Sequence, residues 1–135
     1  MTKTDFFDTD ILVYAVSGDA AKADRAEQLI ASGGIISVQV LNEFASVATR
    51  RLHRPVALVR DILVRFRSLC TVVPLDVATN EDGLDLAERH RLPIYDSMIV
   101  AAALRAGCTV LYSEDFADGQ VIAGLSIRNP FAAHT

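Results

Sequence analysis

The chain has no tryptophan and contains only two cysteines and two lysines among its 135 residues. Cys70 and Cys108 lie far apart and match no metal or redox spacing, so we expect buried apolar side chains instead of a disulfide. No apolar run reaches the roughly 18 residues that a membrane span needs, and none of signal-peptide length follows the N-terminus. These absences predict a cytoplasmic protein without a membrane anchor.

The remaining composition predicts one compact domain, residues 1–135, with 51% hydrophobic and 22% charged residues. The net charge of −4 excludes a general nucleic-acid coat protein, which needs the opposite sign. The charge is nevertheless uneven. Residues 50–67 contain six arginines and only one acid, Asp61; the arginines are Arg50, Arg51, Arg54, Arg60, Arg65 and Arg67. This segment predicts either a solvated helix face or a basic strip that binds phosphates or an acidic partner.

Short apolar runs alternate with helical patterns along the chain. We expect strands before Asp8 and near residues 35–36, 71–75, 109–112 and 126–127. We expect helices near residues 19–32, 37–52, 55–68, 76–89 and 95–105. The order is typical of an α/β fold with three layers, in which helices flank a mostly parallel sheet of four to five strands. Ligands of such sheets bind beyond the carboxyl ends of the strands.

Four acidic residues occupy positions where carboxylates are unusual. Asp8 and Asp115 each follow an apolar strand, whereas Glu43 and Asp96 have apolar residues three or four positions away in their helices. An acid on the inner face of a helix is costly unless something neutralises it, and no lysine follows Lys22. Each acid also has a structural interpretation: Asp8 and Asp96 as helix N-caps, Glu43 as a half-buried side chain and Asp115 as a turn residue.

Four converging carboxylates would repel one another, and a hard divalent cation such as Mg²⁺ or Mn²⁺ would remove that repulsion. Such an ion activates water and stabilises phosphate charge, so the pattern predicts metal-dependent phosphodiester hydrolysis. His53, His90 and His134 do not form a zinc spacing, and we assign them no role.

Four segments in order resemble the motifs of PIN domains, and most closely those of VapC-like toxins from bacterial toxin–antitoxin pairs. They are Phe7–Ala15, Ser37–Phe44, Tyr95–Ala103 and Leu111–Phe116, and Ile127–Phe131 resembles the end of these chains. The resemblance implies a parallel sheet flanked by helices and endoribonuclease activity that depends on Mg²⁺ or Mn²⁺. It also implies RNA as substrate, a cognate antitoxin as partner and a homodimer.

The resemblance assigns roles residue by residue. The metal-site acids would be Asp8, Glu43, Asp96 and Asp115, with Glu114 and Asp118 as alternatives for the last of them. Thr9, Asn42 and Ser113 would support these acids. We further expect Arg50, Arg51 and Arg54, from the basic segment, to contact RNA.

Two other functions remain open at this stage. Asp8 and Asp10 resemble the opening of haloacid dehalogenase-type phosphatases, in which the first aspartate is the nucleophile. Those enzymes need a later lysine, as do receiver domains, and this chain has none after Lys22. The second alternative is a non-catalytic PIN module for binding or assembly, whose sign would be the loss of a central acid; none is lost here.

Overall fold

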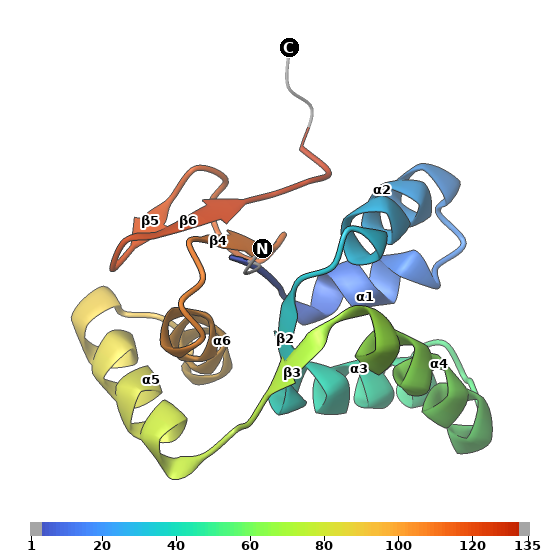
Figure 1. Ribbon diagram of the computed structural model, residues 1–135, viewed down its shortest axis with the longest axis horizontal. Coiled ribbons are helices and arrows are strands. Elements are labelled where there is room, and N and C mark those ends of the chain that lie inside the picture. Colours follow the sequence, from blue (N-terminus) through green and yellow to red (C-terminus); the bar gives the residue numbers. More distant parts are fainter. Residues whose placement is uncertain (1–3, 133–135) are drawn as a thin grey trace.

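The computed structural model describes residues 4–132, and six strands in this range form one sheet (Figure 1). The predicted domain, residues 1–135, includes three residues at each end, His134 among them, that lie outside this range. The strands follow the order β3-β2-β1-β4-β6-β5, and every neighbouring pair is parallel except β5 with β6. Their bounds are β1 Asp5–Phe7, β2 Ile35–Ser37, β3 Thr71–Val73, β4 Val110–Tyr112, β5 Val121–Ile122 and β6 Leu125–Arg128.

Helices cover both faces of this sheet, which confirms the predicted three-layer α/β/α fold. Four of them lie together on one face: α1 Thr9–Ala15, α2 Ala20–Ala31, α3 Val38–Arg50 and α4 Val56–Leu69. On the other face lie α5 Val77–His90 and α6 Ile94–Arg105 (Figure 1). Within residues 4–132, no helix combines the length and the apolar character that crossing a membrane would require.

The sheet has one strand more than the four to five predicted. The additional strand, β5, has only two residues and forms a hairpin with β6. Ala123 and Gly124 connect the two strands, with φ values of 50° and 88°. Such a pair of positive φ angles suits a tight hairpin turn, but a two-residue strand leaves no alternation in the sequence by which to recognise it.

Polar side chains cap the start of several helices. The Ser37 hydroxyl accepts a hydrogen bond from the Val40 N–H at the start of α3. Asp76 caps α5 in the same way through the Thr79 N–H. Asp96, in contrast, is not a cap, because Pro93 occupies that position and Asp96 lies inside the first turn of α6. The carboxylate of Asp96 is therefore free for another role.

The core lies between the sheet and its two helical layers. α6 is buried on nearly all sides from Ser97 to Ala103, because the sheet covers one side and α5 the other. On the opposite face, Phe44 of α3 and Phe66 of α4 meet edge to face at 5.1 Å between ring centres. Cys70 and Cys108 are free and buried, as predicted, and burial raises the pKa of each thiol to about 11.

Candidate active site

Asp8 lies at the carboxyl end of β1, where the chain turns into α1. Its backbone N–H donates to the Tyr112 carbonyl of the adjacent strand β4 at 3.0 Å. Its side chain is only 2% exposed and accepts two hydrogen bonds of 2.7 Å, from the Thr9 N–H and from the Ser113 hydroxyl. Asp8 is thus the N-cap of α1, but this structural role leaves its carboxylate fixed at the ligand-binding edge of the sheet.

Asp10 also belongs to this site, although it is not among the four predicted acids. One carboxylate oxygen accepts a 2.6 Å hydrogen bond from the Glu114 N–H, and the other, Oδ1, is buried and has no hydrogen-bond partner among residues 4–132. Asp8, Asp10 and Asp115 each offer a carboxylate oxygen, and these three oxygens all lie within 4.8 Å of one another. The sequence signal for Asp10 is the spacing Asp8-Thr9-Asp10, which also resembles the opening of the phosphatases.

Glu43 reaches the site from α3 and is held by two side chains. One carboxylate oxygen accepts from the Thr9 hydroxyl at 2.8 Å, and the other accepts from the amide of Gln39 at 2.7 Å. The Gln39 amide also donates to the Tyr95 carbonyl at 3.0 Å, which links α3 to the first turn of α6 beside Asp96. Gln39 is buried and was not predicted; a lone glutamine on a helix carries no signal that it spans two helices.

Three acids follow β4, and their side chains point to different partners. Asp115 is exposed and contributes to the cluster with Asp8 and Asp10, while its N–H donates to the Ser113 hydroxyl oxygen at 3.1 Å. The Glu114 carboxylate instead turns toward α1 and α2. Asp118 accepts a hydrogen bond from the Asn129 N–H at 2.9 Å. Of the three alternatives for the fourth acid, Asp115 is therefore the one within the cluster.

Burial and repulsion raise the pKa of four of the five acids of this site. Burial raises the pKa of Asp8 to about 7, and the charges of Asp115 and Glu43 add to the effect against two opposing hydrogen bonds. Burial and then the charge of Asp8 raise the pKa of Asp10 to about 8. Burial and neighbouring carboxylates also raise the pKa of Asp96 and of Asp115. Within residues 4–132, no arginine or lysine forms a salt bridge with any of these five acids.

This donor set fits a hard divalent cation. The three clustered ligand atoms are carboxylate oxygens, which Mg²⁺ and Mn²⁺ prefer, and no cysteine or histidine belongs to the cluster. The buried Oδ1 of Asp10 lacks a partner, and a bound cation would supply one. A cation would also offset the repulsion that raises the pKa values of the cluster.

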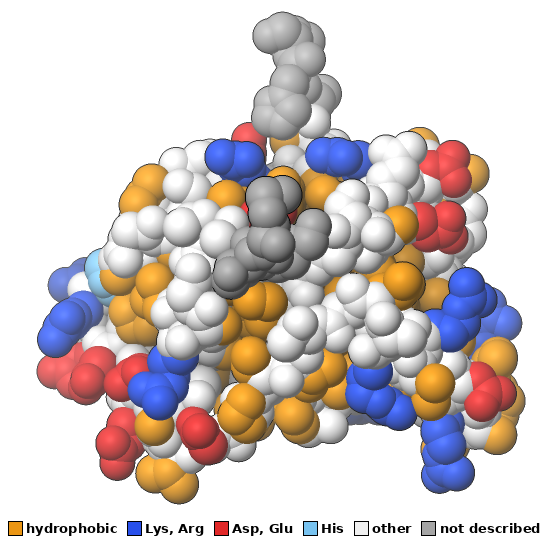
Figure 2. Space-filling view, viewed as in Figure 1, with side chains coloured by type: hydrophobic (Ala, Val, Ile, Leu, Met, Phe, Trp, Pro, Cys, Tyr) orange, Lys and Arg blue, Asp and Glu red, His pale blue; other side chains and the backbone are white. Residues whose placement is uncertain are grey.

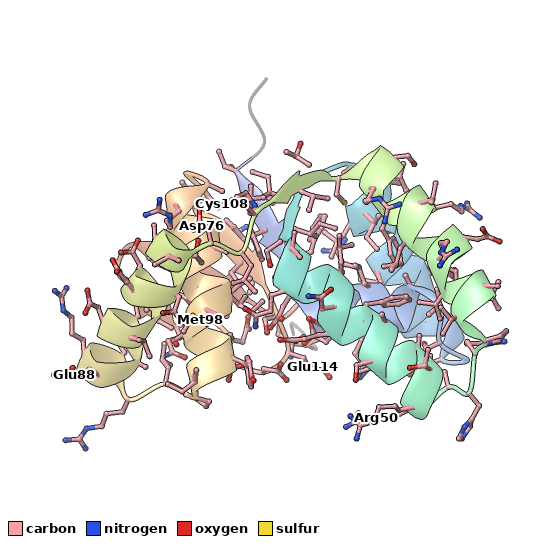
Figure 3. All side chains as sticks on the ribbon, turned by 90° about the horizontal axis from the view of Figure 1, so that it is seen from below. Arg50, Asp76, Glu88, Met98, Cys108 and Glu114 are labelled. Carbon is pink, nitrogen blue, oxygen red and sulfur yellow. The ribbon has the colours of Figure 1, made fainter. Side chains whose placement is uncertain are left out.

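The other predicted residues lie farther from the cluster. Asn42 is exposed and makes no side-chain hydrogen bond within the described part of the chain, so its predicted supporting role has no contact behind it. Arg50 ends α3, while Arg51 and Arg54 follow it, and all three are exposed. In Figure 3, Arg50 lies at the far end of α3. Basic side chains also gather on the surface over α4 (Figure 2).

Known structures share this fold. A toxin–antitoxin complex from Klebsiella pneumoniae matches with a TM-score of 0.72 and 21% identity over 95% of this chain and 98% of that one. DNA-bound VapBC from Salmonella typhimurium matches with a TM-score of 0.71 and 21% identity over 96% and 99%. Mycobacterium tuberculosis VapC20, a toxin that cleaves the sarcin–ricin loop, matches with a TM-score of 0.67 and 21% identity over 82% and 89%.

No curated protein sequence matches this chain. A family profile, in contrast, matches it over residues 6–117, and that profile describes the PIN domain. The matched range contains Asp8, Asp10, Glu43, Asp96 and Asp115, and it favours the PIN resemblance over the phosphatase alternative. Because the match spans most of the sequence, the chain belongs to the PIN domain family.

Proposed function

We propose that the protein is a metal-dependent endoribonuclease and the toxin of a type II toxin–antitoxin pair. The observation that carries the proposal is the cluster of Asp8, Asp10 and Asp115 oxygens within 4.8 Å, beside Glu43, in a PIN domain. The similar VapC20 structure is described as a toxin that cleaves the sarcin–ricin loop, which supports RNA as the substrate class. The proposal places the protein in the cytoplasm, where it would meet its RNA substrate.

The residues that would hold Mg²⁺ or Mn²⁺ are Asp8, Asp10 and Asp115, with Asp96 at the edge of the same site. When bound, the ion would lower the pKa of a ligated water and stabilise negative charge on the scissile phosphate. Ser113 would keep the Asp8 carboxylate in one orientation through its 2.7 Å hydrogen bond. A ligand held in this way costs little entropy on binding.

Glu43 would orient the attacking water and accept its proton. Hydrogen bonds from Thr9 and Gln39 restrict both of its oxygens, so the carboxylate approaches the cluster in a defined direction. Because Gln39 also bonds to the Tyr95 carbonyl, the positions of Glu43 and Asp96 are coupled. Thr9 links the same carboxylate to the start of α1, directly after Asp8.

The RNA would approach along α3. Arg50 follows Glu43 by seven residues and therefore lies on the same face of the helix, about 10 Å along its axis. Ser46, Val47, Arg50 and Arg51 line a shallow cleft of about 370 Å³ on this face. Arg54 lies in the loop that follows. These arginines would bind backbone phosphates and offset the negative charge of the site.

The antitoxin would bind the apolar groove among α1, α2 and α4. The groove has a volume of about 340 Å³, and its lining includes Val16, Ile30, Ile62 and Phe66. The similar structures from Klebsiella pneumoniae and Salmonella typhimurium are toxin–antitoxin complexes, which supports such a partner. We also propose a homodimer, whose mass in solution can be measured by light scattering.

The decisive experiment is cleavage of a mixed RNA pool by the purified protein with Mg²⁺ or Mn²⁺, and with EDTA as control. Asp8→Asn should abolish cleavage, because it removes a ligand charge and the carboxylate that Ser113 orients. Asp85→Asn is the matched control, since Asp85 is exposed on α5, on the opposite face of the sheet. Metal-dependent cleavage retained by pure Asp8→Asn protein would refute the assignment. Folded wild-type protein that binds the metal but cleaves nothing would favour the non-catalytic module.

A further inference from the structure

The loop after β4 shapes the acidic site with three consecutive residues. The Ser113 hydroxyl donates to Asp8 at 2.7 Å, and the Glu114 N–H donates to Asp10 at 2.6 Å. Asp115 then contributes its own carboxylate to the cluster. A shift of this short loop would therefore change the spacing of all three clustered acids at once.

The Glu114 side chain attaches this loop to helices α1 and α2. One carboxylate oxygen accepts from the Tyr14 hydroxyl of α1 at 2.7 Å, and the other accepts from Lys22 Nζ of α2 at 3.1 Å. Lys22 Nζ also donates to the Tyr14 hydroxyl oxygen at 3.1 Å, which closes a ring of three side chains. Glu114 lies between α3 and α6 in the view of Figure 3.

Lys22 is held in place from several directions. Its backbone N–H donates to Asp19, the N-cap of α2, at 3.2 Å. Its ammonium group lies 4.4 Å from the ring centre of Tyr14 and 5.5 Å from that of Phe131. The two rings pack edge to face at 4.7 Å. Lys22 thus joins α2, α1, the loop after β4 and the end of the described chain.

The charge of Lys22 matters because Glu114 adds another carboxylate beside the acidic cluster. Burial is the main cause of the raised pKa of Asp10 and of Asp115, and repulsion from the Glu114 charge adds to both. Within residues 4–132, Lys22 is the only cationic side chain that forms a salt bridge with Glu114. Without it, the Glu114 carboxylate would keep only the hydrogen bond from the Tyr14 hydroxyl, and the neighbouring acidic cluster would oppose its charge, so the loop would be held less firmly.

We propose that Lys22 and Tyr14 are positioning residues for the metal site: they hold Glu114, and through it the Ser113–Asp115 backbone that sets the acids. The proposal rests on the proposed function for the identity of the ion, and on the contacts above for the fastening itself. Among the described residues, the side chains of Lys22 and Tyr14 form no hydrogen bond with the carboxylates of Asp8, Asp10 or Asp115.

The test compares Lys22→Met with Arg105→Met, which removes the other salt bridge of the described chain, an exposed pair with Asp82 between α6 and α5. Mn²⁺ affinity is measured by titration calorimetry on the full chain. We expect Lys22→Met to weaken Mn²⁺ binding about fivefold, as the loss of one partly buried ion pair would, and Arg105→Met to change it less than about twofold. Lys22→Arg keeps the positive charge, so its Mn²⁺ affinity should be close to that of the wild type.

Two further measurements distinguish a positioning role from general destabilisation. In the Glu114→Gln background, Lys22→Met should change Mn²⁺ affinity less than about twofold, because the charge that Lys22 compensates is gone. Hydrogen–deuterium exchange of residues 113–118 in the metal-free protein should become faster in Lys22→Met and not in Arg105→Met.

Each result decides the proposal. Unchanged exchange in Lys22→Met, or unchanged Mn²⁺ affinity beside faster exchange, would overturn it. An equal loss of affinity with and without the Glu114 carboxylate would also overturn it, since Lys22 would then act by another route. If the wild-type protein binds no Mn²⁺ or Mg²⁺, the proposed function fails, and the exchange measurement still decides whether Lys22 fastens the loop.

Discussion

Replacing Asp10 by Asn should make the metal-free protein more stable at alkaline pH and leave it unchanged in acid. In the folded state burial raises the pKa of Asp10 from 3.8 to about 8, so the folded protein keeps a proton that the unfolded chain releases. The free energy of unfolding therefore falls as the pH rises from 3.8 to about 8, and the loss is complete above the folded pKa. Asp8, raised to about 7, acts in the same direction.

The size of the effect follows from the pKa and from access to water. A fully isolated carboxyl group with this pKa would lose about 6 kcal/mol of stability in total as the pH rises from below 3.8 to well above 8, at about 1.4 kcal/mol per pKa unit. Asp115 in the same cluster is exposed, so water reaches the edge of the site and reduces the loss. We expect Asp10→Asn to gain about 2 kcal/mol at pH 8, or roughly 6–10 °C in Tm for a domain of this size.

The assay is thermal unfolding of EDTA-treated wild type and Asp10→Asn between pH 3.5 and pH 8, with Asp85→Asn as control. The asparagine carbonyl can still accept the Glu114 N–H, so the fold is kept. Wild type and variant should agree near pH 3.5, below the unfolded pKa of 3.8, where both carry a neutral side chain at this position in the folded and in the unfolded state, and they should diverge as the pH rises. A difference in Tm that is constant with pH, or a less stable variant at pH 8, would refute the reasoning.

Three further substitutions test metal binding, helix packing and RNA binding one at a time. Ser113→Ala removes a fully buried hydroxyl that donates to Asp8, so Mn²⁺ affinity measured by calorimetry should fall about tenfold; an unchanged affinity would contradict this orienting role. Gly83→Ala places a Cβ that overlaps Met98 Sδ and lies 3.3 Å from the Met98 Cα, so overpacking between α5 and α6 should cost about 1–3 kcal/mol in urea unfolding without changing Mn²⁺ affinity. A Gly83→Ala protein as stable as wild type would contradict this prediction, because Met98 would then have moved aside at little cost. Arg51→Ala should weaken RNA binding in fluorescence anisotropy and lower the slope of log affinity against log salt by about 1; the same slope as wild type would place Arg51 outside the RNA path.

The architecture could be predicted from the sequence because its signals are local. Apolar runs before Asp8 and at residues 110–112 mark buried parallel strands, and Ser37 marks the start of the helix that carries Glu43. The family match and the three-layer fold confirm the architecture that these patterns predict. The hairpin strand β5 was missed, since two residues are too few to show an alternating pattern.

The sequence by itself determined that Asp8 and Asp115 each follow an apolar strand, and the parallel pairing of β1 with β4 then brings both residues to one edge of the sheet. The tertiary structure alone decided the role of Asp10, because an acid in the first turn of a helix is ordinarily a solvated partner of the helix dipole. Only the folded chain shows which face of α1 is covered, and therefore that Asp10 is half-buried with its Oδ1 atom inaccessible to solvent.

The ring of Tyr14, Lys22 and Glu114 was equally inaccessible to sequence reasoning. Lys22 and Glu114 are 92 residues apart, and their 3.1 Å contact depends on how α2 packs beside α1 and on where the loop after β4 ends. Local patterns specify elements through hydrogen bonding and periodicity within a few residues. The partner of a charged side chain depends on packing across the whole domain, which no local pattern contains.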